Sequence, residues 1–402
     1  MGMDLSYKER LPAFSCEILE AEFLLYNHIM KILIATGLFP PEVGGPATYA
    51  KLLLEELPKK GIEVSVLPFS EVRRLPKIVR HFVYFFKALR LARKADVVLA
   101  LDPVSVGLPA IFAAKIAGKR FFVKVVGDYA WEQLQNLESR ILNLEKKFIS
   151  LEEFQGGKYG FITEVRRKIE RYVAKNAERV IVPSKYLKGI VEVWGVSSEK
   201  IKVIYNAFDV PTFSESRESV REKLNIQGRM FLSAGRMVPW KGFDTLINLM
   251  PEIVREIPDA RLYIAGDGPQ ENYLRQIVKD KDLQDSVVFL GRLNQIGLFK
   301  YIRASDIFIL NTGYEGFSHQ LLEVASLGTS VITTNIGGNP ELVEDGVSGI
   351  LVEYNDKAQI KFALTNLVKD NEKRLKLAET AKNKVLNFNT QKMIEELINT
   401  II

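Results

Sequence analysis

Short apolar runs alternate with helical patterns along almost the whole chain, and this alternation constrains the fold more than any other feature. The first run, Lys31–Thr36, has the length and residue types of a buried strand. Helical patterns such as Pro46–Lys60 and Val165–Asn176 separate it from similar runs at Glu63–Pro68, Asp96–Leu101, Arg120–Val126 and Arg179–Pro183. Strand–helix alternation of this kind predicts βαβ units around a parallel sheet.

The alternation pauses at residues 201–213 and then begins again as a second series. Its strand-like runs are Met230–Ala234, Arg261–Ala265, Ser286–Leu290, Ile307–Leu310, Ser330–Thr334 and Gly349–Val352. We therefore predict an α/β fold of two Rossmann-like, doubly wound domains, residues 30–208 and 209–388, that face each other across a cleft. The amphipathic segment 389–402 is interpreted as a helix that can cross back to the first domain.

Residues 1–29 precede the alternating pattern and show no strong periodicity. They lack the basic-then-apolar layout of a signal peptide, and we interpret them as a dispensable appendage, with a packed N-terminal helix as the alternative. The apolar stretch Val97–Ala114 is interrupted by polar, glycine and proline residues, so it predicts a strand, a turn and a buried helix rather than a membrane span. Cys16 is the only cysteine, which excludes an internal disulfide and fits a cytoplasmic location.

The excess of positive charge lies in the first half of the chain. Residues 31–209 carry 30 basic and 19 acidic side chains, whereas residues 210–402 carry 23 and 25. An anionic partner is therefore expected for the first half, and nucleic acid, a membrane surface and a reaction acceptor are the options. No recognised nucleic-acid-binding module is present, so nucleic acid is not a predicted partner.

The basic residues are densest between Glu71 and Lys94, where they surround aromatic side chains. Phe82, Phe85, Phe86 and Leu89 recur at helical spacing and predict one apolar stripe, which belongs either to the core or to a membrane-facing surface. We predict peripheral attachment to the anionic inner face of the cell membrane, since each nearby cation contributes about 1 kcal/mol. The cations of the segment are Arg73, Arg74, Lys77, Arg80, Lys87, Arg90, Arg93 and Lys94.

Two cations, Arg236 and Lys241, lie five residues apart in the loop after the run Met230–Ala234. Ligands of open α/β sheets gather at the carboxyl ends of the strands. An arginine can fork onto two phosphate oxygens and a lysine adds a point charge, so the pair can hold a diphosphate and stabilise it as it leaves. The alternative is a pair of solvated loop cations.

A second candidate site follows the run Ile307–Leu310, where residues 311–323 read Asn-Thr-Gly-Tyr-Glu-Gly-Phe-Ser-His-Gln-Leu-Leu-Glu. Ser318 has the place of a helix cap, and Gly316 lets the backbone approach a ligand closely. Free N–H groups at such a helix start favour an anion. Glu315 and Glu323 can accept hydrogen bonds from sugar hydroxyls, while an ordinary capped helix is the alternative.

Two acidic segments are candidates for catalysis or metal binding. Asp128 follows a strand-like run beside aromatic residues, so it can hold a sugar or cap a helix inside the core. Asp280 and Asp282 have the Asp-x-Asp spacing of many metal-dependent transferases, but their charged surroundings indicate solvated surface. No other carboxylate cluster suits magnesium and no Cys/His cluster suits zinc, so we expect neither a metal nor a cofactor.

Taken together, these residues resemble glycosyltransferase family 4, a large family of retaining enzymes with the GT-B fold, from about Met30 to Asn389. The most specific element is Glu315-x7-Glu323, strengthened by Arg236…Lys241 and by the glycine turns Gly-Asp-Gly-Pro and Gly-Gly-Asn-Pro-Glu. The resemblance implies metal-independent transfer of a hexose-type sugar, with retention, from a UDP- or GDP-linked donor. It places the donor in the C-terminal domain and a glycan or lipid-linked acceptor in the N-terminal domain.

The resemblance also implies individual roles. Arg236 and Lys241 match the diphosphate clamp, Glu323 the ribose ligand, and Glu315 the site of the transferred sugar. Many members carry a histidine near the sugar at the end of an N-domain strand, where this chain offers Asp128. The catalytic set is then Asp128, Glu315, Arg236 and Lys241. The donor-binding set is Gly44, Gly45, Arg236, Lys241, Gly268, Arg292, Leu293, Glu315, Gly316, Phe317, Ser318 and Glu323.

Two other functions remain open. A nucleotide-sugar 2-epimerase on the same fold also clamps a nucleotide diphosphate, but it releases free sugar without an acceptor. A non-catalytic sugar-binding relative needs neither the two cations nor the two glutamates. The Glu-x7-Glu pattern favours transfer.

Overall fold

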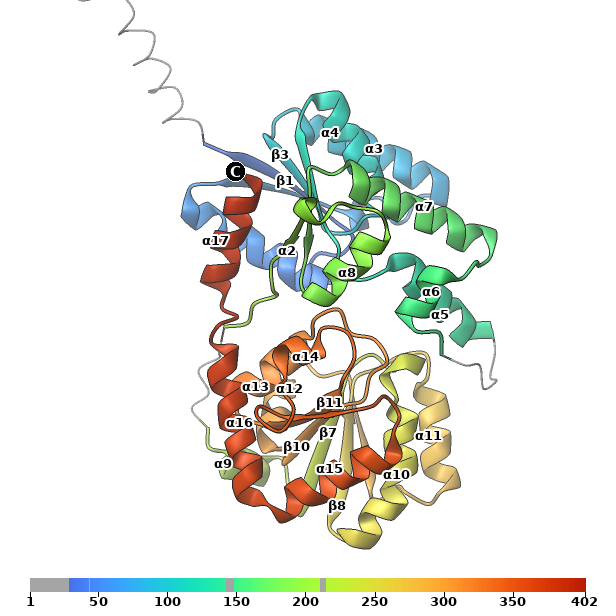
Figure 1. The fold of residues 1–402 in the computed structure, drawn as a ribbon, viewed down its shortest axis with the longest axis vertical. Coiled ribbons are helices and arrows are strands. Elements are labelled where there is room, and N and C mark those ends of the chain that lie inside the picture. The colour runs from blue at the N-terminus through green and yellow to red at the C-terminus, as the bar shows by residue number, and fades with distance from the viewer. Residues whose placement is uncertain (1–28, 43, 142–147, 210–214) are drawn as a thin grey trace, which may run out of the picture.

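The computed structural model describes residues 29–42, 44–141, 148–209 and 215–402, which fold into two α/β domains arranged end to end (Figure 1). The predicted appendage, residues 1–29, lies outside the described residues except for Ile29. The described N-terminal sheet is parallel, with the strand order β2-β1-β3-β4-β5-β6. Its strands are β1 Lys31–Thr36, β2 Glu63–Pro68, β3 Val97–Ala100, β4 Arg120–Lys124, β5 Arg179–Val182 and β6 Ile201–Val203.

Helices cover both faces of this sheet. Residues of α3, α4, α7 and α8 pack with one face around Val98, and residues of α2 pack with the other around Leu99. The helices are α2 Gly45–Glu56, α3 Lys77–Ala92, α4 Gly107–Ala117, α5 Tyr129–Ile141, α6 Leu151–Gly156, α7 Phe161–Asn176 and α8 Lys185–Val193, with 3-10 turns η1 Pro58–Lys60, η2 Phe69–Glu71 and η3 Ser198–Lys200.

The C-terminal domain repeats the plan. Its described sheet is parallel, in the order β12-β11-β10-β7-β8-β9. The strands are β7 Arg229–Ala234, β8 Ala260–Ala265, β9 Val287–Gly291, β10 Ile307–Leu310, β11 Ser330–Thr334 and β12 Ile350–Val352. The helices are α9 Arg217–Lys223, α10 Phe243–Glu256, α11 Glu271–Asp280, α12 Gln295–Ala304, α13 His319–Ser326, α14 Asn339–Leu342, α15 Lys357–Lys369 and α16 Asn371–Val385, with the 3-10 turn η4 Pro239–Lys241.

Strand order marks where a ligand belongs in the C-terminal domain. The chain runs outward from β7 to β9 and then returns to place β10 on the other side of β7. The loops after β7 and β10 therefore flank the topological switch point, where ligands of open α/β sheets bind. These are the loops that carry the two cations and Glu315.

Two connections join the described parts of the domains. After α16 the chain enters α17, Thr390–Ile401, which runs beside β1 and α2 in Figure 1. Met393, Ile394 and Leu397 of α17 pack into the N-terminal core. The two connections are joined to each other, because Phe208 N–H donates to the Phe388 carbonyl at 2.9 Å. Thr390 N–H likewise donates to the Asp209 carboxylate at 3.1 Å.

Some predicted boundaries are wrong. The helix expected over Pro46–Lys60 ends at Glu56, and a separate 3-10 turn begins at Pro58, because proline has no N–H to donate and its ring clashes with the preceding helical turn. The strand expected over Arg120–Val126 ends at Lys124. Lys31–Thr36, Glu63–Pro68, Ile307–Leu310 and Ser330–Thr334 are strands as predicted.

Candidate functional site

The loop after β7 takes its shape from close contact with a glycine turn. A Cβ atom on Gly266 would come within 2.0 Å of the Gly235 carbonyl oxygen, and one on Gly268 within 2.4 Å of the Met237 carbonyl oxygen. Met237 N–H also donates to the Asp267 carbonyl at 2.8 Å. The Gly-Asp-Gly-Pro turn is thus required because the loop that carries Arg236 lies directly against it.

Arg236 and Lys241 differ in their contacts. Arg236 is exposed, whereas Lys241 forms an ion pair with Glu315 of the loop after β10. The Lys241 and Glu315 side chains are only 14% and 19% exposed. A lysine has three N–H donors, so Lys241 can bind a second anion while it stays near Glu315.

Hydrogen bonds join the two loops independently of this ion pair. Gly313 N–H donates to the Trp240 carbonyl at 2.7 Å, and the Thr312 hydroxyl donates to the same oxygen at 3.2 Å. The Asn311 amide donates to the Gly242 carbonyl at 3.0 Å. The backbone therefore holds both loops in one arrangement, and the lysine and the glutamate meet as a result.

A third loop, after β11, packs against the loop after β10 that carries Glu315. Gly338 N–H donates to the Glu315 carbonyl at 2.9 Å, and a Cβ atom on Gly337 would lie 2.0 Å from that oxygen. A Cβ atom on Gly316 would lie 2.6 Å from the Val126 carbonyl oxygen of the N-terminal domain. Glycine at these positions lets three segments of backbone meet, one of them from the other domain.

Helix α13 begins beside the glycine loop of the N-terminal domain. The Ser318 hydroxyl accepts from Leu321 N–H at 3.3 Å, which is the expected cap. A Cβ atom on Gly45 would lie 3.8 Å from the imidazole of His319, the first residue of α13. Burial, and to a lesser degree Lys124, lowers the pKa of His319 to about 4, so this ring is neutral at physiological pH.

Glu323 lies on a different side of the site from Lys241. Burial raises its pKa to about 7, while a hydrogen bond with Gln295, the first residue of α12, acts in the opposite direction. Arg292 and Leu293 precede Gln295 in the loop after β9, with Arg292 exposed and Leu293 half-buried. Glu323 therefore faces this loop, and the two glutamates are placed to contact different parts of a donor.

Asp128 serves as a helix cap. The side chain is 1% exposed, and its two oxygens accept from Trp131 N–H and from the Gln155 amide, each at 2.8 Å. This geometry matches the capping interpretation that the sequence left open. Both carboxylate oxygens already have a donor, so the catalytic role predicted for Asp128 stays a prediction with no contact to support it.

Aromatic rings fill the junction of the two domains. The ring of Trp131, on α5, lies 4.6 Å from that of Tyr314 and 5.4 Å from that of Trp240. Trp240 and Tyr314 belong to the loops after β7 and β10. The sequence offered one signal for this junction, since large aromatic residues inside glycine-rich loops need something to pack against.

Glu341 of α14 connects the C-terminal domain to helix α8 of the N-terminal domain. Its carboxylate accepts from the N–H groups of Lys185 and Tyr186 at 3.0 Å and from the Tyr205 hydroxyl at 2.9 Å. A carboxylate at a helix N-terminus also interacts favourably with the helix dipole. Sequence reasoning missed this role because all three donors are distant along the chain.

Lys124 is a buried cation at the carboxyl end of β4. It is 1% exposed, its Nζ lies 3.5 Å from the centroid of the Tyr49 ring, and it donates to the Asn206 amide oxygen at 3.2 Å. Asn206 in turn donates to the Phe317 carbonyl at 3.4 Å. Burial lowers the pKa of Lys124 to about 7. A chain of polar contacts therefore runs from the N-terminal sheet to Phe317, in the loop between β10 and α13.

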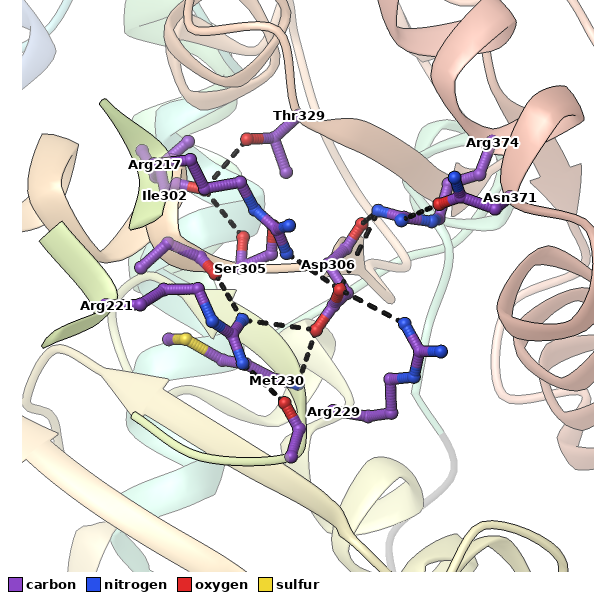
Figure 2. A network of polar contacts seen from close by, with 12 residues as sticks. Arg217, Arg221, Arg229, Met230, Ile302, Ser305, Asp306, Thr329, Asn371 and Arg374 are labelled. Atoms are coloured by element: carbon purple, nitrogen blue, oxygen red, sulfur yellow. Dashed lines mark hydrogen bonds and ion pairs between the residues drawn. The ribbon is translucent and has the colours of Figure 1, made fainter. Parts of the chain in front are cut away.

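A larger charged cluster lies at the opposite edge of the C-terminal sheet (Figure 2). Four arginines surround the buried Asp306 carboxylate, and Met230 N–H donates to it at 2.8 Å. The arginines also hold carbonyl groups at the end of α12, including Ala304 at 2.8 Å. This cluster is far from the loops after β7 and β10, and its contacts are those of a structural support. Its arginines are Arg217, Arg221, Arg229 and Arg374.

The described residues include no group of three or more His, Cys, Asp or Glu side chains that could hold a metal ion. Asp280 and Asp282 are exposed, and Asp280 accepts from the Gln276 amide at 2.6 Å. Their contacts are consistent with solvated surface.

Comparison with known proteins gives a consistent answer. Residues 216–384 match the family described as glycosyl transferases group 1, and residues 43–211 match glycosyltransferase family 4. An uncharacterised glycosyltransferase of Methanocaldococcus jannaschii is 27% identical over 362 residues, covering 85% of this chain and 90% of that protein. N-acetyl-alpha-D-glucosaminyl L-malate synthase of Bacillus anthracis is 24% identical over 393 residues, covering 91% and 96%.

Among solved structures, Anabaena HepE in complex with UDP and glucose has a TM-score of 0.73 at 20% identity. The superposition covers 92% of this chain and 99% of that one, so the two share a fold. The two family matches adjoin one another along the chain and correspond to its two domains. The chain is an enzyme of glycosyltransferase family 4, the group 1 glycosyltransferases, with the GT-B fold.

Proposed function

We propose that the chain transfers a hexose-type sugar from a UDP- or GDP-linked donor to a glycan or lipid-linked acceptor, retaining the anomeric configuration and using no metal. One observation carries this proposal. Arg236, Lys241, Glu315 and the start of α13 converge at the switch point of the C-terminal sheet. A nucleotide diphosphate needs cations and free N–H groups at such a place.

The two cations have different roles in binding the diphosphate. Exposed Arg236 can fork onto two phosphate oxygens, while Lys241 adds a charge close to the sugar-bearing phosphate. As the bond from the anomeric carbon to the phosphate oxygen breaks, negative charge grows on that oxygen, and fixed cations stabilise it. Because these groups are supplied by the protein, no metal is needed to neutralise the leaving group.

Retention follows if the acceptor attacks from the same face that the diphosphate leaves. The acceptor oxygen forms a bond to the anomeric carbon, and its proton passes to the departing phosphate oxygen. The absence of a free carboxylate at Asp128 is in line with a route in which the phosphate itself takes the proton. This route rests on the family resemblance.

Three measurements test the proposal. UDP and GDP are titrated by calorimetry, and UDP-glucose and GDP-mannose are then turned over with and without EDTA. Proton NMR of the product reports its anomeric coupling. We expect nucleotide release that survives EDTA and a product with the donor's configuration. Binding of neither nucleotide, or an inverted product, would contradict the proposal, and free 2-epimer without acceptor would favour the epimerase alternative.

The surface of α3 supports peripheral membrane attachment, although the predicted stripe is wrong in detail. Leu89 is buried and Phe85 is half-buried, whereas Phe82 and Phe86 are 63% and 65% exposed. Tyr84 is fully buried and lies on the face of the helix that packs against the core. The stripe is thus divided, and two phenylalanines point to solvent.

The charges of this surface fall into two groups. Arg73 pairs with Glu42, and Lys87 pairs with Glu71. Arg90, Arg93 and Lys94 are exposed and have no ion pair among the described residues. We propose that these three cations and the two exposed phenylalanines contact an anionic leaflet. No helix in the described part of the chain has the length and hydrophobicity to cross a membrane.

Liposome co-sedimentation tests this attachment. Vesicles of neutral lipid alone and vesicles with anionic lipid are compared at low and high salt. We expect binding to anionic vesicles at low salt that is lost when Arg90, Arg93 and Lys94 are replaced by glutamine. Replacement of Lys279, Lys281 and Arg255 on the other domain is the matched control. Equal binding by both triple variants would contradict the assignment.

A further inference from the structure

Glu132, on the first turns of α5, fills the space beside a glycine at the domain junction. A Cβ atom on Gly127 would lie 2.7 Å from Glu132 Oε1 and 2.6 Å from the Tyr314 hydroxyl. Any side chain at position 127 would therefore collide with both groups.

Three buried or half-buried acids meet at the start of α5, and their contacts differ. Asp128 caps the helix, and Glu170 accepts from the N–H groups of Tyr129 and Ala130. No hydrogen bond or ion pair reaches the Glu132 carboxylate in the described part of the chain. Two acids are thus held by backbone amides, and the third is free to accept a donor from outside the protein.

The charged groups that act on Glu132 include Arg236 and Glu315 of the other domain. Burial raises the pKa of Glu132 to about 7, Asp128, Glu315 and Asp102 act in the same direction, and Arg236 opposes them. Nearby, the Tyr314 hydroxyl is buried without a partner. A carboxylate with no partner, next to a hydroxyl with no partner, points to a ligand with hydroxyl groups.

We propose that Glu132 is a further positioning residue, whose ionised carboxylate accepts a hydrogen bond from a hydroxyl of the transferred sugar, opposite Glu315. The inference rests on the proposed function. In the proposed function Arg236 serves the diphosphate and Glu315 the sugar, and the charges of both act on Glu132, which places it near the point where sugar and diphosphate join.

Ionisation gives the proposal its measurable consequence. The profile of kcat/KM against pH reports groups of the free enzyme. Because Glu132 must lose its proton to act, kcat/KM should fall on the acidic side of about pH 7, where its pKa lies. Glu323 has a similar pKa, so only a variant at residue 132 can assign this acidic limb.

The experiment compares wild type, Glu132→Gln and Glu132→Asp with UDP-glucose and GDP-mannose. The pH is varied between about 5.5 and 9, so that it spans the pKa that burial raises in Glu132. We expect Glu132→Gln to lower kcat/KM above neutral pH by about 10- to 100-fold, the scale for a hydrogen bond to a charged group. The acidic limb should flatten in this variant and persist in Glu132→Asp. Affinity for UDP or GDP alone should not weaken, since the proposal places Glu132 at the sugar and not at the phosphates or the base.

The outcomes separate the inference from the function on which it rests. If wild type neither binds UDP or GDP nor consumes a donor, the proposed function fails. If wild type is active and Glu132→Gln keeps its kcat/KM and acidic limb, the inference is overturned while the function stands. A Glu132→Gln variant that loses affinity for free nucleotide would also overturn it, because the residue would then act on the diphosphate clamp.

Discussion

Each domain has a buried charged side chain at one end of its sheet strands, Lys124 in the first and Asp306 in the second, and these two charges are compensated very differently. Asp306 lies among four arginines at the amino ends of β7 and β10. Lys124 lies at the carboxyl end of β4 with an amide oxygen and an aromatic ring, and no described carboxylate pairs with it. Asp306, which has more opposite charge around it than it carries, is on the edge away from the candidate site. Lys124, which has no opposite charge beside it, is next to the site.

This contrast separates structural from functional charge. A buried ion that is fully paired gains little from any further partner, so it supports the fold. Groups whose charge is poorly met, such as Lys124, Glu132 and Glu323, have shifted pKa values and lie near the domain junction or the donor site. Perturbed groups of this kind cluster where ligands bind.

The largest effect should come from breaking the compensated cluster. Asp306→Ala leaves four guanidinium groups facing one another, and we expect the free energy of unfolding to fall by about 3–5 kcal/mol. Denaturant titration followed by tryptophan fluorescence and circular dichroism measures it. Asp285→Ala, at an exposed position, is the control and should change stability by less than about 0.5 kcal/mol. Similar values for the two variants would show that the cluster does not support the fold.

The next effect concerns the cation at the functional edge of the same domain. Arg236→Ala should weaken UDP or GDP binding by about 1.5–3 kcal/mol, because a charge-assisted hydrogen bond is lost, and stability should hardly change. Calorimetry measures the affinity. Arg255→Ala, an exposed arginine on α10, should bind like wild type. Unchanged affinity in Arg236→Ala would remove this residue from the clamp.

An intermediate effect is expected at the connection between the domains. Glu341→Ala removes the acceptor of two α8 amides and the Tyr205 hydroxyl, while Glu341→Gln keeps one carbonyl oxygen. Hydrogen exchange at Lys185 and Tyr186 should be about tenfold faster in the alanine variant, which corresponds to about 1.4 kcal/mol, and less so in the glutamine variant. Wild-type exchange rates in both would mean that other contacts hold the domains together.

The last effect, at the uncompensated lysine, depends on pH. Folded Lys124 loses its proton near pH 7, whereas an unfolded lysine does so near its ordinary value of 10.5. Between these values the unfolded state binds more protons, so the stability of wild type should rise with pH. Lys124→Met should show a flatter profile over pH 7–10, measured by denaturant titration across this range. Parallel profiles would show that Lys124 keeps its proton when buried.

The sequence predicted the donor side of the molecule better than the junction. Strand ends and loop residues such as Arg236 and Glu315 follow from local pattern, because βαβ order fixes which loops meet. Local pattern does not show which of Asp128 and Glu132 is available to a ligand, since both lie at the start of one helix. The capping hydrogen bond from Trp131 N–H occupies Asp128 and leaves Glu132 free. On α3, Phe82 and Leu89 fit one helical stripe equally well, and only packing against the sheet shows that Leu89 is inside. Glu341 has partners that no local pattern indicates.

Helix α17 has a consequence for the order in which the protein is made. Domains generally fold as units during synthesis, the N-terminal one first. Here Met393, Ile394, Leu397 and Ile401 complete one face of the N-terminal core, yet the ribosome adds them only after the whole C-terminal domain. Until then Ile32, Ile34 and Leu99 lack part of their cover. During synthesis the N-terminal domain therefore keeps an exposed apolar face until the C-terminal domain and α17 have been made.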